Sequence, residues 1–388
     1  MKQGWEIKKL GEVCTIERGG SPRPIQNYLT EADDGINWIK IGDATEGSKH
    51  ITSTKEKIKP EGMKKSRFVH KGDFILSNSM SFGRPYILAV DGCIHDGWLV
   101  IHDNDNRFDK NYLYYYLGSP NIYTEFKRLA VGGVVNNLNS ELVRNVKVCI
   151  PPLAEQEKIV AELDCLSGVI EKKKQQLKEL DALAESIFYT MFGDPITNEK
   201  GWKVKKLGEV CTSDLGKTLD SKKNKGELYN YLCSINVQWG YFDLTTLKEM
   251  RFEESELERY LVKKGDLLIC EGGDTGRCSI WNSDETMYYQ NALHRVRFKD
   301  KTILPIFCQY VMQYLKNNGE IDKYSKGQTI KHLVKSALMS IPIPVPPLPL
   351  QQGFADKIEA IEKQKELIKQ SITETEELFN SRMDYYFG

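Results

Sequence analysis

Two long stretches of the chain repeat apolar residues at the alternating three- and four-residue spacing of a heptad. Each stretch follows a strand-like run that ends in Pro-Pro-Leu, at residues 151–153 and 346–348. Prolines remove backbone donors and end a strand. The pattern therefore predicts two long helices, each with one apolar seam. The seam positions are Ile159, Leu163, Leu166, Ile170, Leu177, Leu180 and Ile187 in the first helix and Phe354, Ile358, Ile361, Ile368, Ile372 and Phe379 in the second.

The breaks in the two seams are polar and fall at Lys173 in the first helix and at Lys365, Thr375 and Arg382 in the second. An apolar seam left in water would favour aggregation, so each helix needs a partner. Because the two seams match in length and phase, we expect the helices to pair with each other as an antiparallel coiled coil. The alternative is that each helix is an ordinary amphipathic element packed on its own domain.

The whole chain is an internal repeat with a period of about 195 residues. Residues 4–15 recur as residues 201–212, and residues 69–76 recur as residues 262–269. The offset between matching positions stays between 193 and 197, so insertions are few. Two copies of one unit that each offer a seam close most simply around a two-fold axis, so we expect the halves to be related by a pseudo-two-fold.

The sequence of each half predicts an α+β domain with a mainly antiparallel sheet, followed by the long helix of that half. A short helical turn and strand surround Lys-Leu-Gly-Glu-Val, and a divergent stretch follows. A Lys-Gly-Asp turn, a buried strand, a Gly-containing loop, further strands and a tyrosine-rich helix complete the half. The predicted boundaries are residues 1–150 for the first domain, 151–194 for the first long helix, 195–345 for the second domain and 346–388 for the second long helix.

The composition is that of an ordinary globular protein, with 40% hydrophobic and 28% charged residues and no net charge. The zero total hides a pattern, because the two domains carry +3 and +4 and the two helical stretches −4 and −3. Basic faces on the domains are therefore compatible with nucleic acid. No apolar signal-peptide core and no long apolar run occur, and the nine cysteines form no Cys-x-x-Cys pair. We expect a cytoplasmic protein with free thiols and no membrane contact.

No motif of a known catalytic site occurs in the sequence. It contains no Walker phosphate loop, no dinucleotide-binding glycine motif, no His-Glu-x-x-His and no Gly-x-Ser-x-Gly. Asp266, Glu271 and Asp274 raise the alternative of a metal nuclease, but Asp73 in the other half has no matching pair. Asp73 and Asp266 are better explained as caps of a turn before a strand. The histidines lack metal-ligand spacing, so we predict no catalytic residue and no metal site.

The loops of the two halves carry polar and basic side chains that differ between the copies, while the surrounding frame repeats. Arg, Lys, Asn and Gln reach base edges, and Ser, Thr and Lys hold phosphates. A repeated frame with different loops is expected if each half recognises a different target. The predicted DNA-binding residues are Arg18, Ser21, Arg23, Asn78, Ser79, Arg84, Asn136 and Asn137 in the first half and Lys217, Thr218, Lys222, Asn236, Gln238, Arg277, Gln328 and Lys331 in the second.

Four features of the chain resemble the specificity subunit of type I restriction-modification systems. They are the tandem units, the Trp-x-x-x-Lys-Leu-Gly-Glu-Val sequence, the Lys-Gly-Asp strand and the Pro-Pro-Leu-x-x-Gln sequence with Gln156 and Gln351. The resemblance covers essentially the whole chain. It implies two target recognition domains, joined by an antiparallel coiled coil, that each bind one half of a bipartite, asymmetric double-stranded DNA site.

The resemblance also implies partners. Two methyltransferase subunits would methylate adenines with S-adenosylmethionine, and restriction subunits would join for ATP- and magnesium-dependent cleavage. This chain itself would bind no cofactor and would have no active site. Two alternatives from other classes stay open: an enzyme, such as a nuclease or a fused methyltransferase, and a protein-binding scaffold without a role on DNA.

Overall fold

The computed structural model describes residues 4–45, 47–79, 82–130, 138–220, 222–299, 302–327 and 331–388. It divides into two compact units. The first unit comprises residues 1–174 with residues 370–388, and the second comprises residues 175–369. Each unit therefore contains the globular part of one repeat and parts of both long helices.

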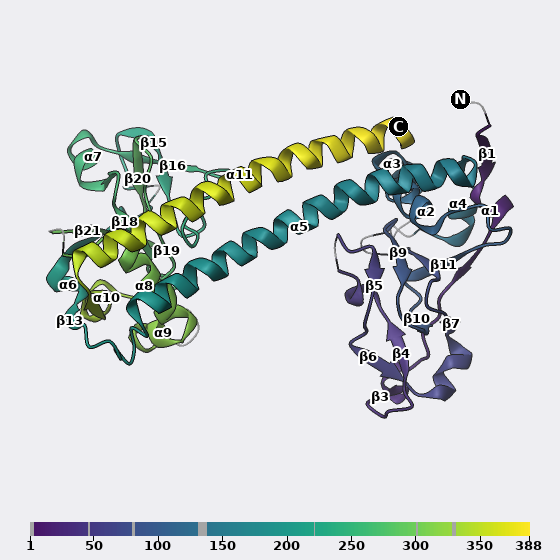
Figure 1. Ribbon diagram of the computed structural model, residues 1–388, viewed down its shortest axis with the longest axis horizontal. Helices are drawn as coiled ribbons and strands as arrows, with labels where there is room; N and C mark the ends of the chain where they lie inside the picture. Colours follow the sequence, from purple (N-terminus) through teal and green to yellow (C-terminus); the bar gives the residue numbers. More distant parts are fainter. Residues whose placement is uncertain are drawn as a thin grey trace. The chain divides into compact units, whose positions relative to one another are not determined.

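The first unit contains a two-stranded ribbon, β1-β12, and two five-stranded sheets with the orders β2-β11-β8-β9-β5 and β3-β6-β4-β10-β7 (Figure 1). Most strand pairs are antiparallel, as expected, but β4 with β10 and β5 with β9 are parallel. The strands are β1 Glu6–Lys9, β2 Cys14–Arg18, β3 Leu29–Thr30, β4 Ile36–Ile39, β5 His50–Ile51, β6 Glu56–Ile58, β7 Arg67–Val69, β8 Phe74–Ser77, β9 Pro85–Leu88, β10 Gly92–Ile94, β11 Trp98–Asp103 and β12 Lys147–Ile150. The helices of this half are α1 Leu10–Val13, α2 Lys110–Leu117, α3 Pro120–Ala130 and α4 Ser140–Arg144.

The strands β8 and β11 are rich in apolar residues because other elements of the unit cover both of their faces. On one face Phe74 and Leu99 join a core that includes α2 and α3. On the other face Ile75 and Val100 pack with β4 and β10 of the second sheet. The sheet β2-β11-β8-β9-β5 thus lies between a layer of helices and a second sheet, which confirms the predicted α+β class.

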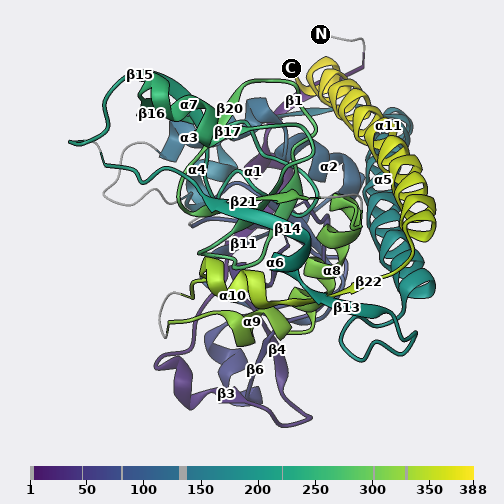
Figure 2. The same cartoon turned by 90° about the vertical axis from the view of Figure 1, so that its left-hand side faces the viewer.

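The second unit repeats this frame with the ribbon β13-β22 and two four-stranded sheets, β14-β21-β18-β19 and β16-β15-β20-β17. Figure 2 shows β22 running beside β13, with α6 and α10 close to this ribbon. The strands are β13 Lys203–Lys206, β14 Cys211–Leu215, β15 Glu227–Leu232, β16 Lys248–Phe252, β17 Leu261–Val262, β18 Leu267–Cys270, β19 Cys278–Ile280, β20 Met287–Tyr289, β21 Leu293–Phe298 and β22 Pro342–Val345. The helices are α6 Leu207–Val210, α7 Glu254–Tyr260, α8 Pro305–Asn317, α9 Glu320–Tyr324 and α10 Lys335–Ser340.

The Lys-Gly-Asp sequence forms the same turn in both units. The Asp73 carboxylate accepts the backbone N–H of His70 at 2.8 Å, and the Asp266 carboxylate accepts that of Lys263 at 2.7 Å. The intervening Gly72 adopts φ +88°, a left-handed conformation that glycine tolerates without a steric penalty. The prediction that these two aspartates cap a turn before a strand is confirmed.

A buried glutamine joins each long helix to its globular half. The Gln156 side chain is fully buried, and its Oε1 accepts the N–H of Asp109 at 2.8 Å. Its Nε2 donates to the carbonyl oxygens of Arg107 and Pro151, both at 2.8 Å. Gln351 makes the same three kinds of bond in the second unit, with Leu304, Thr302 and Pro346 as partners. The Pro-Pro-Leu-x-x-Gln sequence is therefore a hydrogen-bonded anchor for the first turn of the helix.

The two long helices are α5 Leu153–Phe192 and α11 Leu348–Phe387, and they form an antiparallel coiled coil. In the first unit Glu162 pairs with Arg382, with a 2.9 Å bond, and Lys174 pairs with Glu376 at 3.0 Å. In the second unit Lys365 pairs with Asp181 at 2.7 Å. The residue number of the α11 partner falls as that of α5 rises, which defines the antiparallel direction.

The predicted seam positions are buried or half-buried in both helices, whereas the residues between them are mostly exposed. The breaks in the seam carry polar contacts: the Lys173 ammonium donates to the Ser371 carbonyl and to Thr375 Oγ1, both at 3.3 Å. The Phe387 ring of α11 packs in the first unit against Tyr112 and Tyr116 of α2, with centroid distances of 5.7 and 5.5 Å. The end of α11 therefore packs on the globular half of the first repeat, so the alternative in which each helix packs only on its own domain is wrong.

Within the described part of the chain, no helix has the length and apolar character needed to cross a membrane. The nine cysteines are free thiols. No group of three or more His, Cys, Asp or Glu side chains among the described residues is arranged to hold a metal ion.

Candidate nucleic-acid interface

Four side chains predicted to contact DNA meet around one residue of the first unit, Asp96, two at its carboxylate and two at its main-chain carbonyl oxygen. The Ser21 hydroxyl donates to Asp96 Oδ1 at 2.8 Å, and Arg23 Nη2 lies 3.4 Å from Asp96 Oδ2. Arg18 Nε and Asn78 Nδ2 donate to the Asp96 carbonyl oxygen at 2.8 and 3.1 Å. Arg18 ends β2 and the other residues follow β2, β8 and β10, so the fold gathers the ends of separate strands into one cluster.

His95 orients the same carboxylate. Its Nδ1 accepts the N–H of Gly97 at 2.9 Å, and its Nε2 lies 3.0 Å from Asp96 Oδ1. Burial lowers the pKa of His95 below its ordinary value, so the ring is mainly neutral at pH 7 and its Nε2 carries the proton. Burial would raise the pKa of Asp96, but the Ser21 hydroxyl and the nearby positive groups outweigh it and lower that pKa. The Asp96 carboxylate therefore stays ionised, with hydrogen-bond donors around it.

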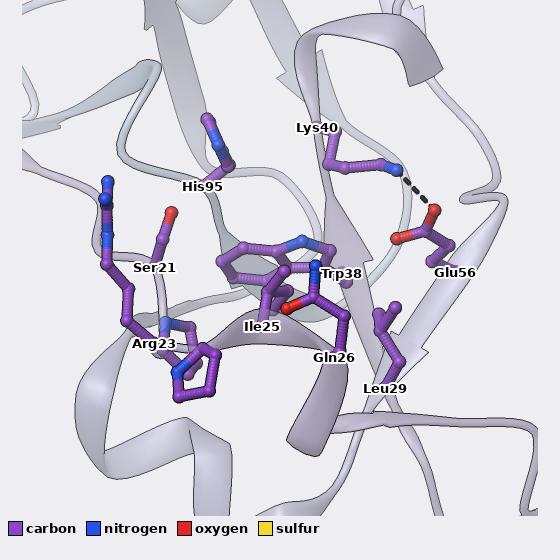
Figure 3. A pocket seen from close by; sticks show the side chains of 11 residues that line it. Ser21, Arg23, Ile25, Gln26, Leu29, Trp38, Lys40, Glu56 and His95 are labelled. Atoms are coloured by element: carbon purple, nitrogen blue, oxygen red, sulfur yellow. Dashed lines mark ion pairs between the residues drawn. The ribbon is translucent and has the colours of Figure 1, made fainter.

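A hollow of about 720 Å³ opens beside this cluster (Figure 3). The buried Trp38 forms its floor, with the His95 ring in an edge-to-face contact at 5.8 Å. The Lys40–Glu56 ion pair, at 2.6 Å, lies on the side opposite Arg23. The hollow is lined by Ser21, Pro22, Arg23, Pro24, Ile25, Gln26, Leu29, Trp38, Lys40, Glu56 and His95.

The second unit has the same backbone frame at the matching place. Gly19 and Gly216 donate to the carbonyl oxygens of Trp98 and Leu293 at 2.9 and 3.2 Å. The backbone N–H groups of the next residues, Gly20 and Lys217, donate to Ile94 and Tyr289 at 3.2 and 3.0 Å, and those of Asn78 and Glu271 donate to Gly97 and Ala292, both at 2.9 Å. These paired bonds align the two clusters residue by residue.

The side chains on this shared frame differ. Asn291 takes the place of Asp96, Gln290 that of His95, and Thr218 that of Ser21. Asn291 Nδ2 donates to Thr218 Oγ1 at 3.4 Å, and Gln290 Nε2 donates to Asn291 Oδ1 at 3.1 Å. An aspartate at the centre of the first cluster is thus replaced by an uncharged amide in the second.

The structure corrects the prediction for Asn78 of the first unit, which is only 2% exposed and donates to the Asp96 carbonyl oxygen, and for two residues of the second unit. Lys217 is only 6% exposed, and its ammonium binds the Glu256 carboxylate and the Arg251 carbonyl, the latter at 2.9 Å. Asn236 is 1% exposed and closes a turn, with its Oδ1 accepting the N–H of Cys233 at 3.0 Å. Burial and internal bonds give these side chains a structural role.

The other predicted residues of the second unit lie in more open positions. Thr218 and Lys222 are exposed. Arg277 donates to the Ser234 carbonyl at 2.8 Å, Gln238 to that of Ile235 at 2.9 Å, and Lys331 to the Asp322 carboxylate at 2.8 Å. In the first unit Ser79 and Arg84 are half-buried, and the backbone of Arg84 bonds to Ser77, with its N–H donating to the Ser77 hydroxyl at 2.9 Å. Asn136, Asn137 and Gln328 lie outside the described residues.

The sequence analysis did not select His95, Asp96, Gln290 or Asn291. One residue separates each pair from the strand that follows it, which is β11 after Asp96 and β21 after Asn291. A residue-by-residue alignment of the two halves would have shown a polar pair in both copies and a change of charge between them. That change is the signal that could have identified them.

Comparisons with known proteins agree with this architecture. The family model described as Type I restriction modification DNA specificity domain matches residues 2–182 and again residues 199–377. The MjaVIII specificity subunit of a type I restriction enzyme from Methanocaldococcus jannaschii is 21% identical, with 95% of this chain and 90% of the relative covered. The EcoKI specificity subunit of Escherichia coli is 24% identical, with 80% and 71% covered.

Two solved structures share the fold. One is a chain from a structural study of complex assembly and conformational transition of the type I R-M system, with a TM-score of 0.64, 20% identity and 100% and 98% of the two chains covered. The other is the S subunit of a type I restriction-modification system from M. genitalium, with a TM-score of 0.57, 13% identity and 98% and 95% covered. Since the family model matches both halves of the repeat, the chain belongs to the family of type I restriction-modification specificity subunits, with one DNA specificity domain in each repeat.

Proposed function

We propose that this chain recognises a bipartite, asymmetric DNA site, with one half-site bound by each domain, and directs methyltransferase and restriction subunits to that site. The observation that carries the proposal is the pair of clusters around Asp96 and Asn291, in which one backbone frame presents different polar groups. Identical frames with different side chains suit two readers of different sequences. Groove contacts would supply the sequence choice and phosphate contacts the salt-dependent affinity.

In this proposal the chain supplies recognition and carries no active site. Two methyltransferase subunits would provide S-adenosylmethionine and transfer its methyl group to adenines, and restriction subunits would provide ATP- and magnesium-dependent cleavage. The target adenine has to leave the base stack to be methylated, so distortion of the DNA is expected in the complex.

The first experiment is a methylome by single-molecule sequencing of cells that express this chain with its partner methyltransferase. We expect N6-methyladenine at one split motif, which disappears when this chain is deleted. A second strain exchanges residues 16–145 for those of another family member. Only one half of the motif should change, because that segment contains the first cluster. A change in both halves, or methylation that does not depend on this chain, would contradict the proposal.

The paired long helices are proposed to set the number of unread base pairs between the half-sites. A heptad inserted at matching points of α5 and α11 keeps the seam in phase and lengthens the pair by about 10 Å, at about 1.5 Å per residue. With about 3.4 Å per base pair, the spacer should grow by about three base pairs while both half-sequences stay the same. The control inserts the same heptad in α5 alone, which places the two seams out of register. An unchanged spacer in the double insertion would refute this part of the proposal.

A further inference from the structure

The Asp96 carboxylate holds the Arg23 guanidinium at one edge. The Arg23 side chain is 81% exposed, and its Nη2 lies 3.4 Å from Asp96 Oδ2. The carboxylate is itself fixed by the Ser21 hydroxyl and by His95 Nε2. Arginine has five N–H donors in a rigid fork, so an anchor at one edge leaves the other donors available in a defined plane.

The surroundings leave room for a partner at the other edge of the guanidinium. Arg23 lines the hollow whose floor is Trp38, and Figure 3 shows its side chain at the rim, separated by the indole from the Lys40–Glu56 pair. Lys40 is already paired with Glu56, so it does not compete with Arg23 for an acceptor. The acceptor that best matches two parallel N–H donors on the edge of a base pair is the O6 and N7 pair of guanine.

The second domain lacks this arrangement at the matching positions. The residue two places after Thr218 is Asp220, where the first domain has Arg23 two places after Ser21. The Asp220 carboxylate accepts the N–H groups of Lys222 and Lys223 at 3.1 and 3.2 Å. The matching positions of the second domain therefore hold an acid instead of a guanidinium, and an amide instead of Asp96.

We infer that Arg23 reads a guanine in the half-site of the first domain and that Asp96 is its positioning residue. This inference rests on the proposed function and names one base of the site. Because Arg23 and Asp96 act as a pair, the loss of either should relax the same base pair. The second half-site should be unaffected, since its domain has Asp220 and Asn291 at these places.

The test compares methylomes of the whole complex assembled with the wild-type chain, Arg23→Lys, Arg23→Ala and Asp96→Asn. The half-site read by the first domain is identified by the exchange of residues 16–145. We expect a G·C pair in that half-site whose discrimination falls roughly 10- to 100-fold in Arg23→Ala, which removes the donors, and falls less in Arg23→Lys, whose ammonium lacks the planar fork. Asp96→Asn should relax the same position, and every other position of the motif should keep its preference.

Arg128→Lys is the matched control, because Arg128 is an exposed arginine of α3 paired with Glu125 in the same unit. It should leave the motif unchanged. A uniform loss of methylation in Arg23→Ala with the same motif would assign Arg23 to a phosphate and overturn the inference. A first half-site without a G·C pair would overturn it as well. A wild-type complex that methylates no split motif would instead contradict the proposed function, and equal melting temperatures of the four proteins exclude unfolding as the cause.

Discussion

The glutamine anchor at the start of α5 allows a quantitative test of the fold. Gln156 satisfies three backbone groups at once, the N–H of Asp109 and the carbonyl oxygens of Arg107 and Pro151, each at 2.8 Å. Replacing Gln156 by Leu keeps a side chain of similar size in a fully buried site but removes every bond. The three backbone groups then remain without these partners inside the protein.

The expected cost follows from the number of bonds lost. A hydrogen bond contributes about 1 kcal/mol net, and a buried group left unsatisfied costs about 1–3 kcal/mol. Three groups give a loss of about 3–9 kcal/mol in the free energy of unfolding, the lower value applying where water reaches some of the groups. With a urea slope of about 3 kcal/mol per molar, the midpoint should fall by about 1 M or more.

The assay is urea unfolding of the purified chain followed by far-UV circular dichroism. Gln351→Leu should cause a loss of the same size, because Gln351 makes the equivalent bonds in the second unit. Glu157→Gln is the control, since Glu157 is the exposed neighbour on α5 and should shift the midpoint little. A Gln156→Leu midpoint within 0.2 M of the Glu157→Gln control, taken as about 0.6 kcal/mol at that slope, would refute the anchor.

Three further changes test the packing of the long helices. Phe387→Ala removes a buried ring from the first unit and should cost about 3 kcal/mol in urea unfolding. Glu162→Gln should remove a contribution to stability that depends on pH, because the hydrogen bond from Arg382 lowers the pKa of Glu162 in the folded state. That contribution is present above the unfolded pKa of about 4.3 and is lost as the pH falls through the lower folded value, so the two midpoints should converge in acid. Lys173→Leu should raise the urea midpoint and produce oligomers in light scattering, because a half-buried polar seam position fixes the helix register at a cost in stability.

The controls and contrary results differ for each change. Tyr385→Ala alters an exposed ring two residues before Phe387 and should lower the free energy of unfolding far less than Phe387→Ala. Equal losses would contradict the assigned packing of Phe387. A Glu162→Gln difference that is constant from pH 7 to pH 3 would show that the pair does not titrate with folding. Lys172→Leu alters an exposed neighbour, and if it produced the same oligomers as Lys173→Leu, surface hydrophobicity would be the cause.

The sequence predicted the parts of the fold that depend on local pattern. The heptad spacing and the Pro-Pro-Leu sequences predicted α5 and α11, which begin and end close to the expected residues. The Lys-Gly-Asp turn followed from the preference of aspartate and glycine for such positions. These features could be predicted because each is encoded within a few neighbouring residues.

The candidate site could be predicted only in part, because its geometry joins residues far apart in the chain. Arg18, Ser21 and Asn78 were selected as loop residues, but their common centre, Asp96, lies 75 residues beyond Ser21. Lys217 was predicted to be an open basic residue, yet Glu256 of α7 binds its ammonium. The first unit has a 3-10 helix, Pro60–Lys65, before β7 where the second unit has α7 before β17, and Gly20 takes the place of Lys217, so the repeat gave no warning of this ion pair.

The division of the chain into units also shows why a repeat is not the same as a folding unit. Met383 and Phe387 belong to the second repeat but lie in the core of the first unit, and Phe188 and Phe192 belong to the first repeat but lie in the core of the second. A cut at the repeat boundary would remove Met383 and Phe387 from the core that holds Tyr112. A segment exchange that preserves both domains should therefore replace residues within 16–145 and keep both long helices, because those helices complete each core while the loops around Asp96 and Asn291 carry the difference between the domains.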